Sequence, residues 1–218
     1  MDLPIENRSR AGQALADALA KNGYGADALV LALPRGGVPV AAPVAGRLGA
    51  ALDLMVVRKL GFPGHEEFAM GAIASGGIRI MNDDMLQRQP VAQDDIDEVA
   101  RRELTELERR ERAYRGDRPE PRLSERTVIL VDDGLATGAT MRAAIRACRD
   151  RGAKTVCVAV PVGPTDSLER LRHEADDVVC LATPEPFSAI GQWYREFDQT
   201  GDEEVRRLLA QAWERHPS

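Results

Sequence analysis

Short apolar runs alternate with amphipathic segments along most of the chain. Residues 9–21 place apolar side chains at helical spacing, and Gly23 follows as a stop signal. Continuous apolar runs of four to eight residues are typical of strands that are buried on both faces. The runs that we interpret as strands are residues 27–33, 52–57, 126–131, 154–160 and 178–183.

Helical patterns occupy much of the sequence between these runs. The segments predicted to be helical are residues 38–50, 93–115, 138–152 and 202–216. We interpret 93–115, which is highly charged, as a half-solvated helix, with a dedicated partner-binding helix as the alternative. The glycine-rich stretch 61–77 is expected to be a loop or an irregular hairpin. The alternation predicts an α/β fold: a mostly parallel central sheet of about five strands with helices on both faces.

In such a sheet, ligands bind at the carboxyl ends of the strands. The segments that directly follow the predicted strands are therefore the candidate site. These segments are residues 34–37, 58–59, 132–140, 161–164 and 183–187.

The clearest chemical pattern is VILVDDGLATGAT at 128–140. Two carboxylates, Asp132 and Asp133, follow a buried strand and precede a loop of small residues at the start of a helix. Backbone N–H groups and the helix dipole converge in such a loop, so a phosphate fits there. The loop residues are Ala136, Thr137, Gly138, Ala139 and Thr140. The absence of a Walker sequence and of G-x-G-x-x-G favours a phosphorylated sugar over ATP or a dinucleotide.

Composition narrows the classes of function. The formal net charge of -6 argues against a broad nucleic-acid or anionic-membrane surface. The three cysteines, Cys148, Cys157 and Cys180, lie in apolar contexts without metal-ligand spacing, so we expect buried free thiols and a cytoplasmic location. Neither a leader peptide nor a run of about 18 apolar residues is apparent, so secretion and membrane insertion are not expected.

The stretch VDDGLATGAT resembles the signature of the type I phosphoribosyltransferases, which bind 5-phosphoribosyl-1-pyrophosphate (PRPP). The stretches LPRGGVP and VVRKLGFPGHEEFAMGAIA are similar to a bacterial group within that family. The resemblance covers about residues 27–185. It implies a single domain over 1–218, with a small hood built from the N-terminal segment and residues 186–218.

The resemblance implies roles for the acidic pair and the loop. Asp132 and Asp133 would contact the ribose hydroxyls and serve as ligands toward Mg²⁺, which bridges pyrophosphate and ribose oxygens. Residues 136–140 would hold the 5-phosphate. A structural Asp pair that caps a helix turn is the alternative.

The resemblance also identifies a pyrophosphate loop at residues 34–37. Its members would be Pro34, Arg35, Gly36 and Gly37, with a cis peptide between Pro34 and Arg35 and with Arg35 holding the pyrophosphate. The alternative is a plain tight turn with a surface arginine.

Arg58 and Lys59 would lie near the same pyrophosphate, below a flexible closing loop at 60–77. The alternative is a pair of surface cations. Within the loop, His65, Glu66 and Glu67 are candidate proton donors or acceptors, with solvated loop charges as the simpler interpretation.

Aromatic residues gather after the last predicted strand. Phe187, Trp193 and Tyr194 are expected either to cover a planar acceptor or to form a small core under the hood.

The expected activity is Mg²⁺-dependent transfer of the 5-phosphoribosyl group from PRPP to a nitrogen acceptor. Asp132, Asp133, Arg35 and Lys59 are the predicted catalytic residues. The alternative is a non-catalytic PRPP-sensing regulator. The 6-oxopurine members carry an aspartate where this chain has Ala136, so an adenine-like base, a pyrimidine or another amine is the expected acceptor. The predicted partners are PRPP and that small molecule, with a homodimer as a possible assembly and neither nucleic acid nor a membrane.

Overall fold

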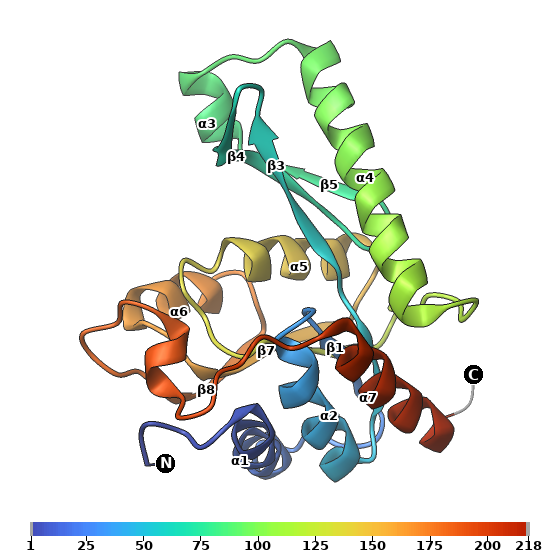
Figure 1. The fold of residues 1–218 in the computed structure, drawn as a ribbon, viewed down its shortest axis with the longest axis vertical. Helices are drawn as coiled ribbons and strands as arrows, with labels where there is room; N and C mark the ends of the chain where they lie inside the picture. The colour runs from blue at the N-terminus through green and yellow to red at the C-terminus, as the bar shows by residue number, and fades with distance from the viewer. Residues whose placement is uncertain (1, 217–218) are drawn as a thin grey trace.

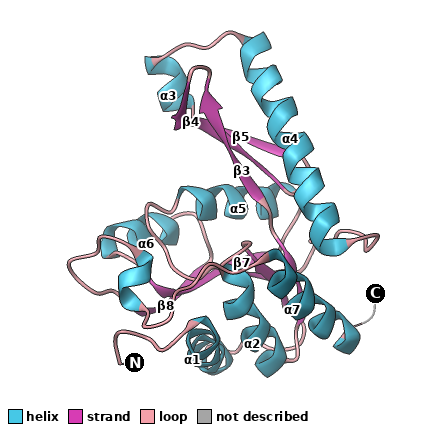
Figure 2. Cartoon of the chain, viewed as in Figure 1, coloured by secondary structure: helices cyan, strands magenta, loops and turns pink. Residues whose placement is uncertain are grey.

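A five-stranded parallel sheet forms the centre of the protein, as Figures 1 and 2 show for this computed structural model. The structure describes residues 2–216 and leaves out the side chain of Glu67. The strand order is β2-β1-β6-β7-β8, and all neighbours in it are parallel. The strands are β1 Leu29–Ala32, β2 Ala51–Leu54, β6 Thr127–Val131, β7 Thr155–Val162 and β8 Asp177–Ala182. The predicted fold class is confirmed.

Helices cover both faces of this sheet because strand side chains alternate between two apolar cores. Val30 and Ile129 belong to the core shared with α1, α2 and α7, whereas Leu31 and Leu130 belong to the core shared with α5 and α6. Figure 1 shows α1, α2 and α7 below the sheet and α5 above it. The bounds are α1 Arg8–Lys21, α2 Gly37–Leu48, α5 Ala139–Asp150, α6 Thr165–Arg172 and α7 Asp202–Arg215.

A second, antiparallel sheet lies on the far side of α5 from the first (Figure 1). We call this sheet and the two helices that follow it the arm. The arm comprises β3 Val57–Phe62, β4 His65–Ala74, β5 Ile78–Met81, α3 Asp83–Arg88 and α4 Gln93–Arg115. Leu60, Phe62 and Ile73 share a core with Ile96 and Leu107, so α4 covers one face of the antiparallel sheet. The helix predicted at 93–115 is confirmed, and its apolar stripe is packed within the chain.

The arm corrects one expectation from the sequence and decides between two alternatives for another. The second predicted strand ends at Leu54 rather than at 57, so Arg58 and Lys59 lie on β3 of the arm. The stretch 61–77 is an irregular hairpin rather than a loop. It contains the end of β3, all of β4 and the turn before β5, and its register shifts at Gly61. The irregular hairpin was one of the two predicted alternatives. The helices α3 and α6 were not predicted.

A buried ionic cluster joins the base of the arm to the parallel sheet. Arg115, at the end of α4, donates from Nε to Asp53 Oδ1 over 2.7 Å and from Nη1 to Glu111 Oε1 over 3.0 Å. Its Nη2 donates to the Leu54 carbonyl over 2.9 Å. Ser75 donates to the same Glu111 oxygen. These groups are buried, so their charges are compensated only by one another.

Two smaller expectations concern the thiols and the membrane. Cys148 and Cys157 are buried free thiols, and Cys180 is a free thiol that is half buried. Within residues 2–216, no helix is long and apolar enough to cross a bilayer.

Replacing Arg115 by Ala is expected to lower the free energy of unfolding by about 3–5 kcal/mol, because Asp53 and Glu111 would remain buried without their cation. Urea unfolding measures the loss. Arg112→Ala is the matched control, since Arg112 is exposed on the same helix and should change stability by less than about 0.5 kcal/mol. Equal effects of the two substitutions would contradict the role of the cluster.

Candidate active site

Two loops meet at the point where the strand order of the parallel sheet reverses. The chain leaves β1 toward β2 on one side, whereas β6 continues to β7 and β8 on the other. The crevice outside the carboxyl ends of β1 and β6 is therefore a topological switch point, where open α/β sheets bind ligands. The Leu33 N–H donates to the Val131 carbonyl over 2.9 Å, which holds the two loops side by side. The sequence patterns at 34–37 and 132–140 are thus brought together.

The loop after β1 turns sharply at Pro34. The peptide between Pro34 and Arg35 is cis, as expected from the resemblance. A Cβ on Gly36 would overlap Asp133 Oδ2, and one on Gly37 would lie 2.6 Å from the Val131 carbonyl oxygen. Only glycine allows this close approach, so both glycines are required by the contact between the two loops.

The acidic pair lies at the end of β6, with Asp132 half buried and Asp133 buried. The Asp133 N–H donates to Asp132 Oδ1 over 2.8 Å. Burial and the neighbouring Asp133 raise the pKa of Asp132 well above its usual range. Burial also raises the pKa of Asp133, although its ion pair with Arg8 opposes that rise. Two crowded carboxylates thus make the ligand-free site costly to ionise, which favours a cation or hydroxyl donors beside it.

The predicted phosphate loop leads into α5. Gly138 has a φ of 79° and occupies the N-cap of the helix. Because this residue has no side chain to satisfy the first N–H groups of α5, those donors can bind an anion. The neighbouring residues Ala136, Thr137, Ala139 and Thr140 are exposed.

Arg35 contacts α7. Its Nη1 lies 3.5 Å from Asp202 Oδ1. Tyr114 of α4 donates to the same oxygen over 2.8 Å. The pKa of Asp202 is lowered by the Tyr114 hydrogen bond and then by Arg35. Asp202 thereby holds Arg35, the residue predicted to bind pyrophosphate, between the parallel sheet and the arm.

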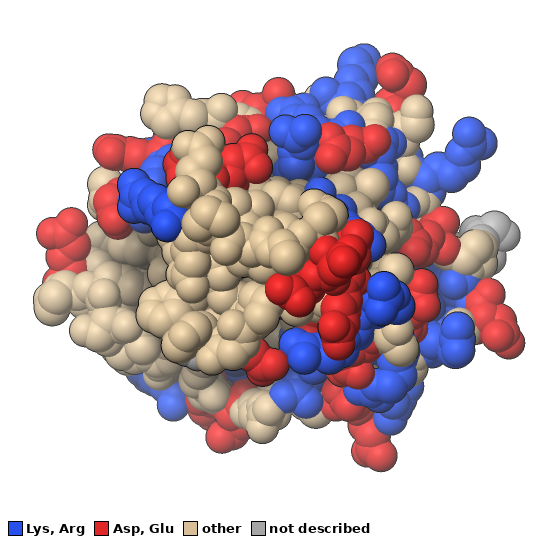
Figure 3. Space-filling model, turned by 90° about the horizontal axis from the view of Figure 1, so that it is seen from above, with Lys and Arg blue, Asp and Glu red and all other residues tan. Residues whose placement is uncertain are grey.

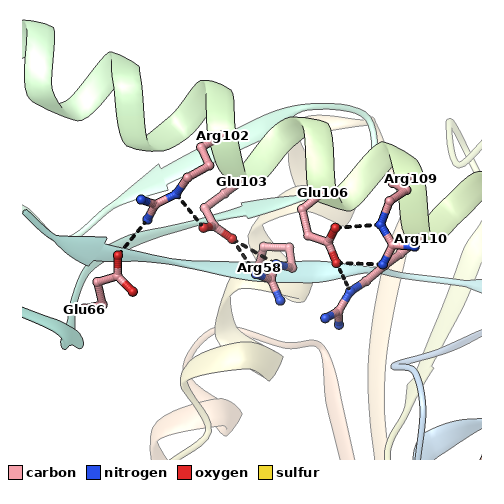
Figure 4. Close-up of polar contacts among 7 residues, drawn as sticks. All are labelled: Arg58, Glu66, Arg102, Glu103, Glu106, Arg109 and Arg110. Atoms are coloured by element: carbon pink, nitrogen blue, oxygen red, sulfur yellow. Dashed lines mark hydrogen bonds and ion pairs between the residues drawn. The ribbon is translucent and has the colours of Figure 1, made fainter.

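Arg58 and Lys59 lie on opposite faces of β3 because side chains alternate along a strand. Arg58 points to α4, where its Nη2 lies 2.6 Å from Glu103 Oε2 (Figure 4). This contact does not support the predicted role of Arg58 at pyrophosphate. Glu66 is exposed and pairs with Arg102 over 3.2 Å (Figure 4), whereas the side chain of Glu67 lies outside the described residues.

Lys59 lines a cavity of about 1010 Å³ between the arm and α5. Ala139 and Thr140 of the phosphate loop line the same cavity, so the structure brings Lys59 toward that loop. The rest of the lining mixes apolar arm residues with charged residues of α5. Seen from above, a broad area of uncharged residues is bordered by charges of both signs (Figure 3).

The N-terminal segment pairs with the segment that carries the aromatic residues. Ile5 forms a parallel bridge with Tyr194. Phe187 lies 6.2 Å from Trp193 between ring centroids, in a small core that also includes Ile5. This core supports the second interpretation of the aromatic cluster. The sequence interpretation missed one residue of this region, Arg8, whose Nε donates to Asp133 Oδ2 over 2.8 Å.

The fold is an open α/β sheet with a crevice at its switch point, and comparison with known proteins identifies its family. The chain matches the family described as "Phosphoribosyl transferase domain" over residues 4–195. The chain belongs to this family, as the resemblance of its motifs implied.

Individual relatives extend the similarity to nearly the whole chain. Two Mycobacterium tuberculosis proteins, each named "Putative phosphoribosyl transferase", are 48% identical to it over 208 residues. These residues are 95% of this chain and 47% of each relative, so the chain spans about half the length of these proteins. The crystal structure of TT1426 from Thermus thermophilus is 42% identical, with a TM-score of 0.84 over 95% of this chain and 98% of that one.

Asp132→Asn is expected to raise the melting temperature of the ligand-free protein at neutral pH. Because the folded-state pKa of Asp132 is raised, the native state binds the proton more tightly than the unfolded chain. Stability therefore falls as pH rises from the unfolded pKa of about 3.9 through the folded one. The side-chain amide of Asn does not ionise, so the substitution removes this loss of stability. The melting temperature is expected to rise by at least about 2 °C, equivalent to roughly 1 kcal/mol in a protein of this size.

Thermal unfolding from about pH 4 to about pH 8 measures this effect, and the gain should shrink toward the acidic end. Asp202→Asn is the control of opposite sign, since the folded-state pKa of Asp202 is lowered. A gain for Asp132→Asn that does not change with pH would contradict the assignment.

Proposed function

We propose that the protein transfers the 5-phosphoribosyl group from PRPP to a nitrogen acceptor and releases pyrophosphate. The observation that carries this proposal is the meeting of two loops at the switch point: an anion-binding helix start at 136–140 and a glycine turn at 34–37, with Asp132 and Asp133 between them. PRPP has a phosphate at one end, a pyrophosphate at the other and two ribose hydroxyls between. Membership of the family supports the same reaction class.

In this proposal, each loop holds one end of PRPP. The N–H groups of 136–140 bind the 5-phosphate, Asp132 and Asp133 accept hydrogen bonds from the ribose hydroxyls, and Arg35 holds the pyrophosphate. The bond between C1 and the pyrophosphate oxygen breaks, and its electron pair leaves with pyrophosphate. The acceptor nitrogen then bonds to C1 and loses its proton. Cations fixed at the leaving group stabilise this transition state more than the ground state.

The donor set at the acidic pair suits magnesium. Among residues 2–216, no three His, Cys, Asp or Glu residues form a metal-binding group. Mg²⁺ is commonly held by one or two carboxylates together with substrate oxygens, so Asp132 and Asp133 fit as its protein ligands when PRPP is present. The ion would supply charge neutralisation at the pyrophosphate.

The acceptor is proposed to be an adenine-like base, a pyrimidine or another amine. Ala136 is exposed at the start of the phosphate loop, and its methyl group cannot accept a proton from a 6-oxopurine. Phe187 packs with Trp193 against the small core of the hood, so the proposal on the acceptor rests on Ala136.

Pyrophosphate release in the presence of PRPP, Mg²⁺ and single bases tests the reaction. We expect turnover with at least one amine acceptor and little with hypoxanthine or guanine. The binding of PRPP is measured in parallel by calorimetry. PRPP binding without any turnover would favour the sensing regulator, no PRPP binding would overturn the proposal, and rapid turnover with hypoxanthine would overturn only the argument from Ala136.

Arg35→Ala is expected to weaken the binding of pyrophosphate by about tenfold or more, because a charge-assisted hydrogen bond contributes about 1.5–3 kcal/mol. Binding of ribose 5-phosphate should change less than about twofold, since 136–140 holds that phosphate. Calorimetry with each ligand and Mg²⁺ measures both. Arg47→Ala removes an exposed arginine of α2 and is the control. Equal losses for the two ligands would contradict the division of the site.

A further inference from the structure

One residue from the opposite end of the sequence contacts the acidic pair. Arg8 is the first residue of α1, and its Nε donates to Asp133 Oδ2 over 2.8 Å. Both side chains are only 12% exposed, so this ion pair is well shielded from water. A shielded, charge-assisted hydrogen bond of this length is much stronger than an ion pair on the surface.

Arg8 is itself fixed by residues of the hood. Its Nη1 donates to the Asp198 carbonyl over 2.7 Å, and its guanidinium carbon lies 3.9 Å from the centroid of the Phe197 ring. That ring stacks on Tyr194 at 5.0 Å between centroids. Tyr194 in turn donates its hydroxyl to the Asp133 carbonyl over 2.6 Å. The contacts form a closed ring around Asp133, so the side chain and the backbone of this residue are held at once.

The carboxylate of Asp133 therefore has little freedom to rotate. Arg8 binds Oδ2, and the same oxygen occupies the place where a Cβ on Gly36 would stand. The Asp132 carboxyl also lies within hydrogen-bond reach of the Asp133 side chain. Because Arg8 anchors Oδ2, the direction of the other oxygen, Oδ1, is fixed as well.

We infer that Arg8 is a positioning residue for the sugar of PRPP: it fixes the Asp133 carboxylate so that Oδ1 can accept a hydrogen bond from a ribose hydroxyl. This inference rests on the proposed function. Fixing the carboxylate before binding removes the entropy that the ligand would otherwise have to overcome. The guanidinium also keeps a compensating charge beside Asp133 when the site is empty. The N-terminal helix thereby becomes part of the sugar-binding site, although it lies 125 residues away in the sequence.

The test compares Arg8→Ala and Arg8→Lys with Arg10→Ala. Arg10 is a matched control because it lies in the first turn of the same helix but is exposed and pairs with Glu6. Calorimetry with Mg²⁺ measures the affinity for ribose 5-phosphate, PRPP and pyrophosphate. Arg8→Ala should weaken the binding of ribose 5-phosphate and PRPP by about tenfold, and the binding of pyrophosphate by less than about twofold. Arg8→Lys should show a smaller loss, since an ammonium keeps the charge but not the forked geometry.

A loss of affinity for ribose 5-phosphate and PRPP, but not for pyrophosphate, would show that Arg8 positions the sugar site. A purely structural role would lower only the melting temperature. In turnover, KM for PRPP should rise more than kcat falls in Arg8→Ala. Wild-type affinity for ribose 5-phosphate in a folded Arg8→Ala protein would overturn the inference, as would equal losses in Arg8→Ala and Arg10→Ala. If Arg8→Ala does not fold, wild-type affinity in Arg8→Lys overturns it. Failure of the unmodified protein to bind PRPP would overturn the proposed function and this inference together.

Discussion

A buried carboxylate at the end of a central strand is the constraint on which the candidate site depends. Asp133 follows β6 and is buried, so its charge has to be compensated by groups that approach it closely. Arg8 supplies the compensating cation, and two further parts of the chain contact the same residue: Tyr194 holds its backbone carbonyl, and Gly36 leaves the space that the carboxylate occupies. The N-terminal helix, the loop after β1 and the segment after β8 are thereby held around one residue.

The parallel sheet and its two glycine-containing loops follow closely from the sequence. The apolar runs are long enough to be recognised as strands, and the loops directly follow β1 and β6, so their meeting is implied once the strands are parallel. The cis peptide at Pro34 was also expected, from the resemblance of LPRGGVP. These features depend on residues that are near one another in sequence or on the order of strands.

The arm and the contact of Arg8 with Asp133 depend on residues far apart in the sequence, so a local sequence pattern does not reveal them. Gly61 and Gly64 made 61–77 look like a loop, because the packing of its strands against α4 involves residues much later in the chain. Arg58 and Lys59 were expected to act together, but they are adjacent on a strand and so face opposite sides. The charge on Arg8 does not stand out in a helix that also carries Arg10 and Lys21, and its partner lies 125 residues away. Only the folded chain makes that pairing visible.

The arm behaves mechanically as a cantilever. Its root is clamped by the buried contacts of Arg115 with Asp53 and Glu111, whereas Phe68 near the hairpin tip is 57% exposed. A small tilt at the clamped root would displace the tip more than the root, because the displacement grows with distance from the root. Lys59 lies on this lever above the start of α5. A tilt at the root would therefore change the distance between that ammonium and the phosphate loop, although the ionic cluster lies outside the crevice.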